Sequence, residues 1–201
     1  MTSTGAQFTS RLGSQSIDLP LVEVAPDVAI ALFITFDRGI STLQTAGREL
    51  AERLRPHGPE VVATNATCGI PVAIEVSRAL GLDDYVVLQK TPKIHLADAY
   101  TEPLSSITTD RDQALRLDRA RQPAVAGRRT VLVDDVISTG GSINAGSRLL
   151  RSAGADLVGI GLLFDEGDEW REALGDDAGL VHSLGHLPVF RRDAGGWEPI
   201  G

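Results

Sequence analysis

Hydrophobic residues follow two patterns along this chain, short continuous runs and stripes with helical spacing, and the two alternate from residue 28 onward. The runs predict strands, and they lie at 28–36, 61–64, 85–88, 130–133 and 157–164. The stripes predict helices, and they run from Ser41 to the His57-Gly58-Pro59 break, from Ile70 to Leu80, and from Ile143 to Ala153. This alternation predicts an α/β fold with a central, mostly parallel sheet and helices on both faces.

The two ends of the chain carry no such pattern. Residues 1–16 and 191–201 are polar or glycine-rich, so we expect them to be loosely held. No internal repeat or low-complexity linker divides the chain, and residues 1–201 are expected to form a single domain.

Composition narrows the class of protein. The 201 residues have a formal net charge of −8 and a pI near 4.9, without a basic run, which argues against a nucleic-acid partner. Cys68 is the single cysteine, which excludes an internal disulfide framework and suits a reducing compartment. No apolar run is long enough to span a bilayer and no secretory signal is seen, so we expect a cytoplasmic protein without a membrane partner.

The segment from Thr130 to Ser142, TVLVDDVISTGGS, carries the strongest chemical signal. An apolar run leads into two carboxylates, Asp134 and Asp135, and then into a loop of small residues that opens a helix. Backbone N–H groups at such a helix start bind an anion, and the two glycines allow close approach. We therefore expect a phosphate-binding site formed by five residues of the loop: Ser138, Thr139, Gly140, Gly141 and Ser142. The alternative is an ordinary strand with a solvent-exposed acidic end.

This segment resembles the 5-phosphoribosyl-1-pyrophosphate (PRPP) motif of the type I phosphoribosyltransferases. The resemblance implies the type I fold, with a small hood built from the N-terminal part and the C-terminal segment, and a flexible lid at about 90–112. It implies that Asp134 and Asp135 are catalytic residues that bind the ribose hydroxyls and hold Mg²⁺ indirectly, through PRPP or water. It also implies a homodimer.

A second turn is Thr64-Asn-Ala-Thr-Cys-Gly69. It corresponds to the loop that binds pyrophosphate in members of this family. The resemblance assigns Thr67, Cys68 and Gly69 to pyrophosphate binding through backbone amides. Many members carry a basic residue there and this chain does not. For Cys68, a small buried side chain is favoured over a reactive thiol.

The segment from Gln89 to Tyr100 resembles the mobile lid, and its Lys-x-x-Lys-x-His spacing is similar to the orotate branch of the family. On this basis Lys90 and Lys93 would stabilise the departing pyrophosphate as catalytic residues, with His95 as a further donor. A solvated hairpin with scattered charges is the alternative.

The base that accepts the phosphoribosyl group, called the acceptor below, is the least constrained part of the prediction. Hypoxanthine–guanine enzymes place an aspartate where Ser138 stands, whereas the strand at 157–164 ends here in Asp165 and Glu166. Carboxylates accept hydrogen bonds, which favours the exocyclic amine of adenine over a carbonyl. Overall the chain is most similar to the adenine/xanthine group, with Phe164 as a candidate to stack on the base.

Two other functions stay open. The acceptor could be orotate or another heterocycle, and the chain could be a non-catalytic PRPP-binding regulator. His182 and His186, at helix-like spacing, are expected to be structural and not metal ligands.

Overall fold

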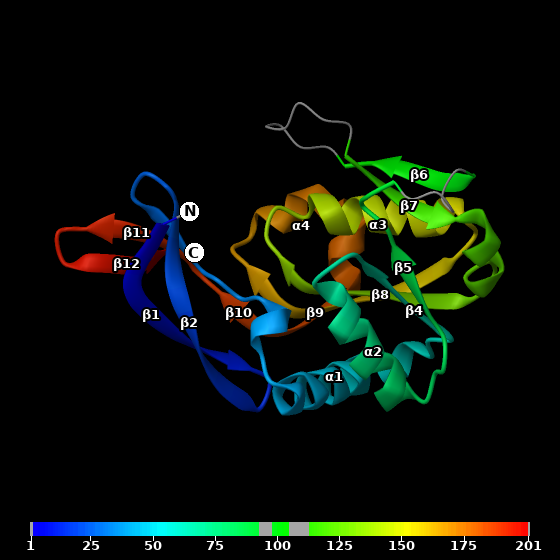
Figure 1. Ribbon diagram of the computed structural model, residues 1–201, viewed down its shortest axis with the longest axis horizontal. Helices are drawn as coiled ribbons and strands as arrows, with labels where there is room; N and C mark the ends of the chain where they lie inside the picture. Colours follow the sequence, from blue (N-terminus) through cyan, green and yellow to red (C-terminus); the bar gives the residue numbers. More distant parts are fainter. Residues whose placement is uncertain (1, 93–97, 105–112, 201) are drawn as a thin grey trace.

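The computed structural model describes residues 2–92, 98–104 and 113–200. Its central sheet has five parallel strands in the order β10-β9-β8-β4-β5 (Figure 1). The strands are β4 (Val61–Asn65), β5 (Tyr85–Leu88), β8 (Arg129–Ile137), β9 (Asp156–Glu166) and β10 (Val181–Leu187). The predicted α/β fold with a parallel sheet is therefore confirmed, and β10 is a strand that the apolar runs did not indicate.

Helices cover both faces of this sheet, as predicted. Helices α1 (Ile40–Leu54) and α2 (Gly69–Leu80) pack on one face, and α3 (Gly141–Ser152) and α4 (Glu169–Leu174) pack on the other (Figure 1). All five residues of β4 are buried, which explains why the strand is a continuous short run without alternation. Short 3-10 helices connect these elements in the described residues: η1 (Thr35–Asp37), η2 (Arg55–His57), η4 (Arg119–Ala124) and η5 (Gly175–Leu180).

A second sheet, the outer sheet, stands at one end of the molecule and contains both ends of the chain (Figure 1). Its order is β1-β2-β3-β11-β12, all antiparallel. The strands are β1 (Thr2–Leu12), β2 (Gln15–Ala25), β3 (Val28–Ala31), β11 (Val189–Asp193) and β12 (Gly196–Ile200). The prediction that residues 1–16 and 191–201 are loosely held is wrong for all of them that the structure describes.

The outer sheet is stable because one of its faces is covered. Leu12, Leu19, Leu21 and Phe190 are buried in the same hydrophobic cluster as α1 and α2. The strand predicted at 28–36 stops at Ala31, and the chain then turns through η1. Thr35 directs this turn, since its buried hydroxyl donates to the carbonyl of Cys68 at 2.8 Å.

A two-stranded hairpin, β6 (Ala99–Pro103) with β7 (Ala114–Asp118), lies beside α3. Paired backbone hydrogen bonds between Gln89 and Arg116, at 2.8 and 2.9 Å, attach it to the end of β5. The hairpin occupies part of the segment predicted as a lid. In the part of the chain that is described, no helix has the length and apolar character that a membrane span requires.

Candidate functional site

The predicted phosphate loop forms a hollow at the start of α3. Strand β8 ends at Ile137, and the chain turns through Ser138, Thr139 and Gly140 into the helix. A cavity of about 190 Å³ lies within this turn, lined by residues 136–143. Because α3 has three turns, its free N–H groups and dipole favour an anion there. The structure thus brings together the five residues predicted to bind phosphate.

The backbone conformation and close packing at residue 140 of this loop require a glycine. Its φ is +80°, in the left-handed region that favours glycine. An added Cβ would lie 3.0 Å from the Cβ of Ala173 and 3.2 Å from the backbone of Trp170. Helix α4 therefore packs directly behind the loop and supports its shape.

The two carboxylates of β8 lie below the loop in different environments. Asp134 is buried and Asp135 is partly buried. The side-chain amide of Asn65 donates to Oδ2 of Asp134 at 3.2 Å, and the backbone N–H of Asp135 donates to Oδ1 at 3.0 Å. Burial, followed by the neighbouring charge of Asp135, raises the pKa of Asp134 to about 8. Burial also raises the pKa of the Asp135 carboxyl.

The predicted pyrophosphate turn lies against Asp134. It follows β4 and leads into α2, with a cis peptide bond between Ala66 and Thr67. A Cβ on Gly69 would lie 2.5 Å from Oδ1 of Asp134 and would overlap the hydroxyl of Thr64. Only glycine fits here, so the turn is in contact with the carboxylate pair. Thr67 is exposed at its tip.

Cys68 is half-buried in the same turn. Burial, and then the charge of Asp135, raise the pKa of its thiol. The side chain is therefore held as a neutral thiol rather than a reactive thiolate.

Lys90 follows β5 and has an exposed side chain. Its backbone carbonyl accepts a hydrogen bond from the guanidinium of Arg116 at 3.1 Å. The positive charge of Lys90 partly offsets the rise in the pKa values of Asp135 and Cys68. Lys93 and His95 lie outside the described residues.

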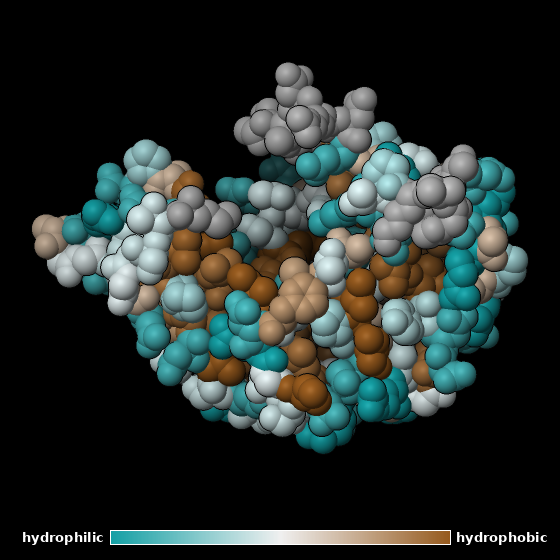
Figure 2. Space-filling view, viewed as in Figure 1, coloured by the Kyte–Doolittle hydropathy of each residue, from teal (hydrophilic) through white to brown (hydrophobic). Residues whose placement is uncertain are grey.

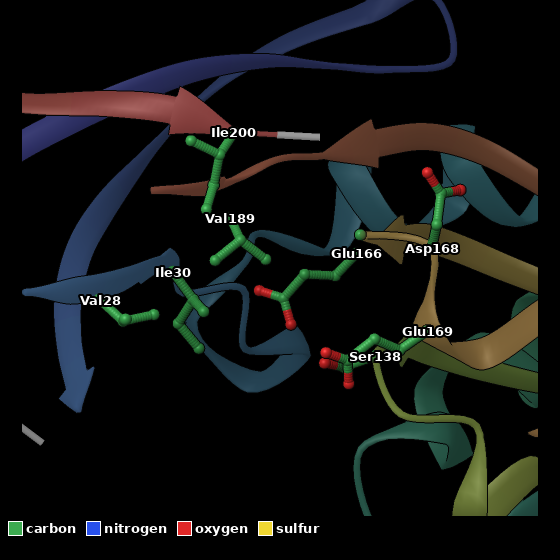
Figure 3. A pocket seen from close by; sticks show the side chains of 9 residues that line it. Val28, Ile30, Ser138, Glu166, Asp168, Glu169, Val189 and Ile200 are labelled. Carbon is green, nitrogen blue, oxygen red and sulfur yellow. The ribbon is translucent and has the colours of Figure 1, made fainter. Parts of the chain in front are cut away.

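A larger pocket of about 420 Å³ lies between the outer sheet and the central sheet, where the surface is hollowed in Figure 2. Four side chains of the outer sheet form the apolar wall of this pocket: Val28, Ile30, Val189 and Ile200. Residues 166–169 and Ser138 form the opposite, polar wall (Figure 3). Ser138 lines both this pocket and the phosphate hollow, so the two cavities adjoin at its side chain.

Glu166 is the buried acid of the larger pocket, with 6% of its surface exposed. Figure 3 shows its carboxylate pointing into the cavity, toward Ile30 and Val189. Burial raises the pKa of Glu166, and a side-chain hydrogen bond with Ser138 partly offsets that rise.

Two of the residues predicted to contact the acceptor do not line this pocket. Asp165 is bound to the β10 side chains His186, at 2.6 Å between Oδ1 and Nδ1, and Ser183. Phe164 is fully buried, with its ring centroid 5.1 Å from that of Phe33. Successive side chains of a strand point to opposite faces, which separates Asp165 from Glu166, and the Phe33 ring covers Phe164. Neither residue lines this pocket, and both assignments stay predictions.

The sequence reasoning gave no role to the apolar wall or to Asn65. It predicted the strand that contains Val28 and Ile30 but nothing that linked them to Val189 and Ile200. Asn65 lies inside the predicted pyrophosphate turn, and its position at a buried strand end could have indicated its role.

The comparisons with known proteins agree with this geometry. Residues 40–183 match the family described as phosphoribosyl transferase domain. The chain is 28% identical to xanthine phosphoribosyltransferase 1 of Clostridium perfringens over 76% of its length and 80% of the relative. It is 31% identical to adenine phosphoribosyltransferase of Acidiphilium cryptum over 65% of its length and 73% of the relative. The structure of adenine phosphoribosyltransferase from Thermoanaerobacter pseudethanolicus is similar in fold, with a TM-score of 0.59, 23% identity, and coverage of 71% of this chain and 79% of the other.

Proposed function

The chain belongs to the phosphoribosyl transferase family, and from that premise we propose that it transfers the 5-phosphoribosyl group of PRPP to adenine, releasing pyrophosphate and forming AMP. The observation that carries this proposal is the junction of two cavities at Ser138, a phosphate hollow and an acceptor pocket. A transfer between two substrates requires such adjacent sites.

The donor half of the proposal assigns PRPP to the central sheet. The 5-phosphate would bind at the N-terminus of α3, and the carboxylates of Asp134 and Asp135 would accept hydrogen bonds from the ribose hydroxyls. Pyrophosphate would contact the backbone of Thr67, Cys68 and Gly69. The contact of Gly69 with Asp134 supports this arrangement, because it brings the pyrophosphate turn and the ribose carboxylates together.

The reaction breaks the bond between C1 of ribose and pyrophosphate while a ring nitrogen of the base bonds to C1. Negative charge grows on the leaving group, and Lys90 and Lys93 would compensate it, with His95 as a further donor. The protein's other task is to fix both substrates and exclude water from C1.

Mg²⁺ is the cofactor we propose. Within the described residues, no group of three His, Cys, Asp or Glu side chains could hold a metal ion. The carboxylates of Asp134 and Asp135 are hard oxygen donors, which suits Mg²⁺ held mainly by PRPP oxygens and water. When bound, the ion neutralises charge on the pyrophosphate.

Adenine as the acceptor rests on the polar wall of the pocket. Its ionisable groups, Glu166, Asp168 and Glu169, are all carboxylates. Carboxylates accept hydrogen bonds from N–H groups, of which adenine has both an exocyclic amine and a ring N–H. The relative named as an adenine phosphoribosyltransferase supports the same choice.

The same wall disfavours orotate, the alternative suggested by the lid spacing, because orotate is itself a carboxylate and would be repelled. A PRPP-binding regulator is the second alternative. The acceptor pocket argues against it, since a sensor of PRPP alone has no use for a second cavity beside the phosphate hollow.

We also propose a cytoplasmic homodimer in which the outer sheet serves as the hood. The dimer follows from the family resemblance alone. The location rests on the single cysteine, which suits a reducing compartment.

Pyrophosphate release from PRPP and Mg²⁺ tests the proposed function, with adenine, guanine, hypoxanthine, xanthine and orotate supplied separately. We expect release with adenine. Release with orotate alone would show that the lid spacing is the better guide to the acceptor. PRPP binding without release with any base would support the regulator.

A further inference from the structure

Transfer to a purine requires a proton acceptor that the proposed function has not yet assigned. The imidazole ring of adenine carries one N–H proton. When its other ring nitrogen forms the bond to C1 and pyrophosphate departs with the bonding electron pair, that proton has to leave. A carboxylate within hydrogen-bond reach of the ring is suited to receive it.

We infer that Glu166 is the catalytic base, accepting the ring N–H proton of the acceptor at the junction of the two cavities. The inference rests on the proposed function and goes one step beyond it. Three observations carry it: the burial of Glu166, its direction into the pocket, and the pocket wall that it shares with Ser138.

The first observation separates Glu166 from the other acids of the pocket. Asp168 and Glu169 are exposed at the start of α4, and Asp168 is paired with the guanidinium of Arg171 at 3.0 Å. Glu166 has no salt-bridge partner among the described residues. A carboxylate that is buried and without a cationic partner binds a proton more readily than one in water.

The second observation concerns what faces the carboxylate. The outer sheet contributes side chains that neither donate nor accept protons: Val28, Ile30, Val189 and Ile200. A planar base that binds between an apolar wall and a carboxylate contacts the apolar side chains with its ring and directs its N–H edge toward the acid. It also removes competing water from around the proton acceptor.

The third observation ties Glu166 to the donor site. Ser138 belongs to the phosphate loop and lines the phosphate hollow as well as the larger pocket. Glu166 lines the same wall of the larger pocket as Ser138. The proposed base is thereby placed near the junction of the two cavities, where a purine would lie to reach C1 of PRPP.

Burial also raises the pKa of Glu166 above the ordinary value of a glutamate. A catalytic base is most effective when its pKa lies near the working pH of the enzyme. The rise is due to burial, and no neighbouring charge contributes to it.

The experiment compares Glu166→Gln with the matched change Glu172→Gln, an exposed α4 residue that does not line the pocket. Glutamine retains the shape and one acceptor oxygen but cannot take up a proton. We expect kcat with adenine to fall by about 100-fold or more, with the KM for adenine close to that of the wild type. Glu172→Gln should leave kcat unchanged.

The wild-type enzyme provides a second measurement that needs no variant. Its kcat should decrease on the acid side of the pH profile as Glu166 becomes protonated, and Glu166→Gln should lack this decrease. PRPP binding serves as the check that the variant is folded.

Two results would overturn the inference and leave the proposed function intact. One is a Glu166→Gln enzyme with wild-type kcat, or with a change in KM alone, which would make Glu166 a recognition residue only. The other is a wild-type pH profile without the acid-side decrease, which decides the matter even if the variant does not fold. A wild-type protein that releases no pyrophosphate with any base would instead overturn the proposed function, and the inference with it.

Discussion

Asn65 and Asp134 are joined across the central sheet, since the side-chain amide of Asn65 donates to the Asp134 carboxylate at 3.2 Å. The same amide donates to the carbonyl of Ser142, also at 3.2 Å, in the first turn of α3. One buried side chain at the end of β4 thus holds both Asp134 and the start of α3. Asn65 itself belongs to the turn proposed to bind pyrophosphate, so three parts of the proposed donor site share this anchor.

Replacing Asn65 with Asp should therefore destabilise the fold and weaken PRPP binding together. The variant loses both N–H donors and sets a second carboxylate against Asp134 and the Ser142 carbonyl. We expect a loss of about 3 kcal/mol in the free energy of unfolding, measured by urea denaturation. Asn144→Asp removes a single hydrogen bond to the Ala173 carbonyl and should cost less. Equal losses would contradict the anchoring role.

Replacing Gly69 with Ala should damage the same site by crowding. The new methyl group would lie 2.5 Å from Oδ1 of Asp134, a distance that forces the turn or the carboxylate to move. We expect a loss of about 1–3 kcal/mol in stability and weaker PRPP binding by calorimetry. Gly179→Ala is the control, because nothing lies within 4 Å of its added Cβ. A Gly69→Ala protein that binds PRPP normally would refute the close packing of turn and carboxylate.

Protonation of Asp134 should make stability depend on pH. Its pKa is raised from 3.8 to about 8 in the folded protein, so the folded state binds more protons than the unfolded state between these values. Stability should then decrease as pH rises from about 4 to about 8. Asp134→Asn should reduce this decrease and be more stable than the wild type at pH 8, by 1 kcal/mol or more, since one pKa unit corresponds to about 1.4 kcal/mol.

The same substitution should abolish turnover, because Asn cannot supply the carboxylate that the ribose hydroxyls require. Thermal unfolding from pH 4 to pH 9, without ligand, measures the stability difference. Asp156→Asn, at an exposed carboxylate, should leave the pH dependence unchanged. Identical curves for Asp134→Asn and the wild type would show that Asp134 titrates normally.

Lys90 and Lys93 are the only lysines of the chain, which allows a chemical test of the proposed lid. Acetylation removes their charges and should lower the rate of pyrophosphate release at least about 10-fold. PRPP with Mg²⁺ present during the reaction should protect activity. Mass spectrometry identifies the modified residues, and the variants Lys90→Ala and Lys93→Ala separate their contributions. Full activity with both lysines acetylated would exclude them from catalysis.

Strands β4, β5, β8 and β9 and helices α1, α2 and α3 could be predicted because their apolar patterns are clear, whereas β10 and the six-residue α4 were missed. Strands β4 and β8 are buried on both faces and therefore consist of continuous apolar runs. The sequence predicts the phosphate loop for a different reason, since carboxylates, hydroxyls and glycines in that order before a helix are typical of an anion-binding loop.

Most of the outer sheet could not be predicted, because only β3 falls in a predicted apolar run and the other strands mix polar and apolar residues. In β1, buried Ser10 and Leu12 alternate with exposed residues, and only partners distant in sequence make that face a core. The different positions of Asp165 and Glu166 could not be predicted either. The two are neighbours in sequence, but Glu166 lines the pocket while Asp165 is bound to His186.

The division of the acceptor pocket between two sheets bears on how this protein can diversify. Groups proposed to bind PRPP come from the central sheet, whereas Val28, Ile30, Val189 and Ile200 come from the outer sheet. Mutations in the outer sheet can therefore accumulate without disturbing Asp134 or the phosphate loop. Selection acting on those four positions could exchange one acceptor for another while the donor chemistry is inherited unchanged.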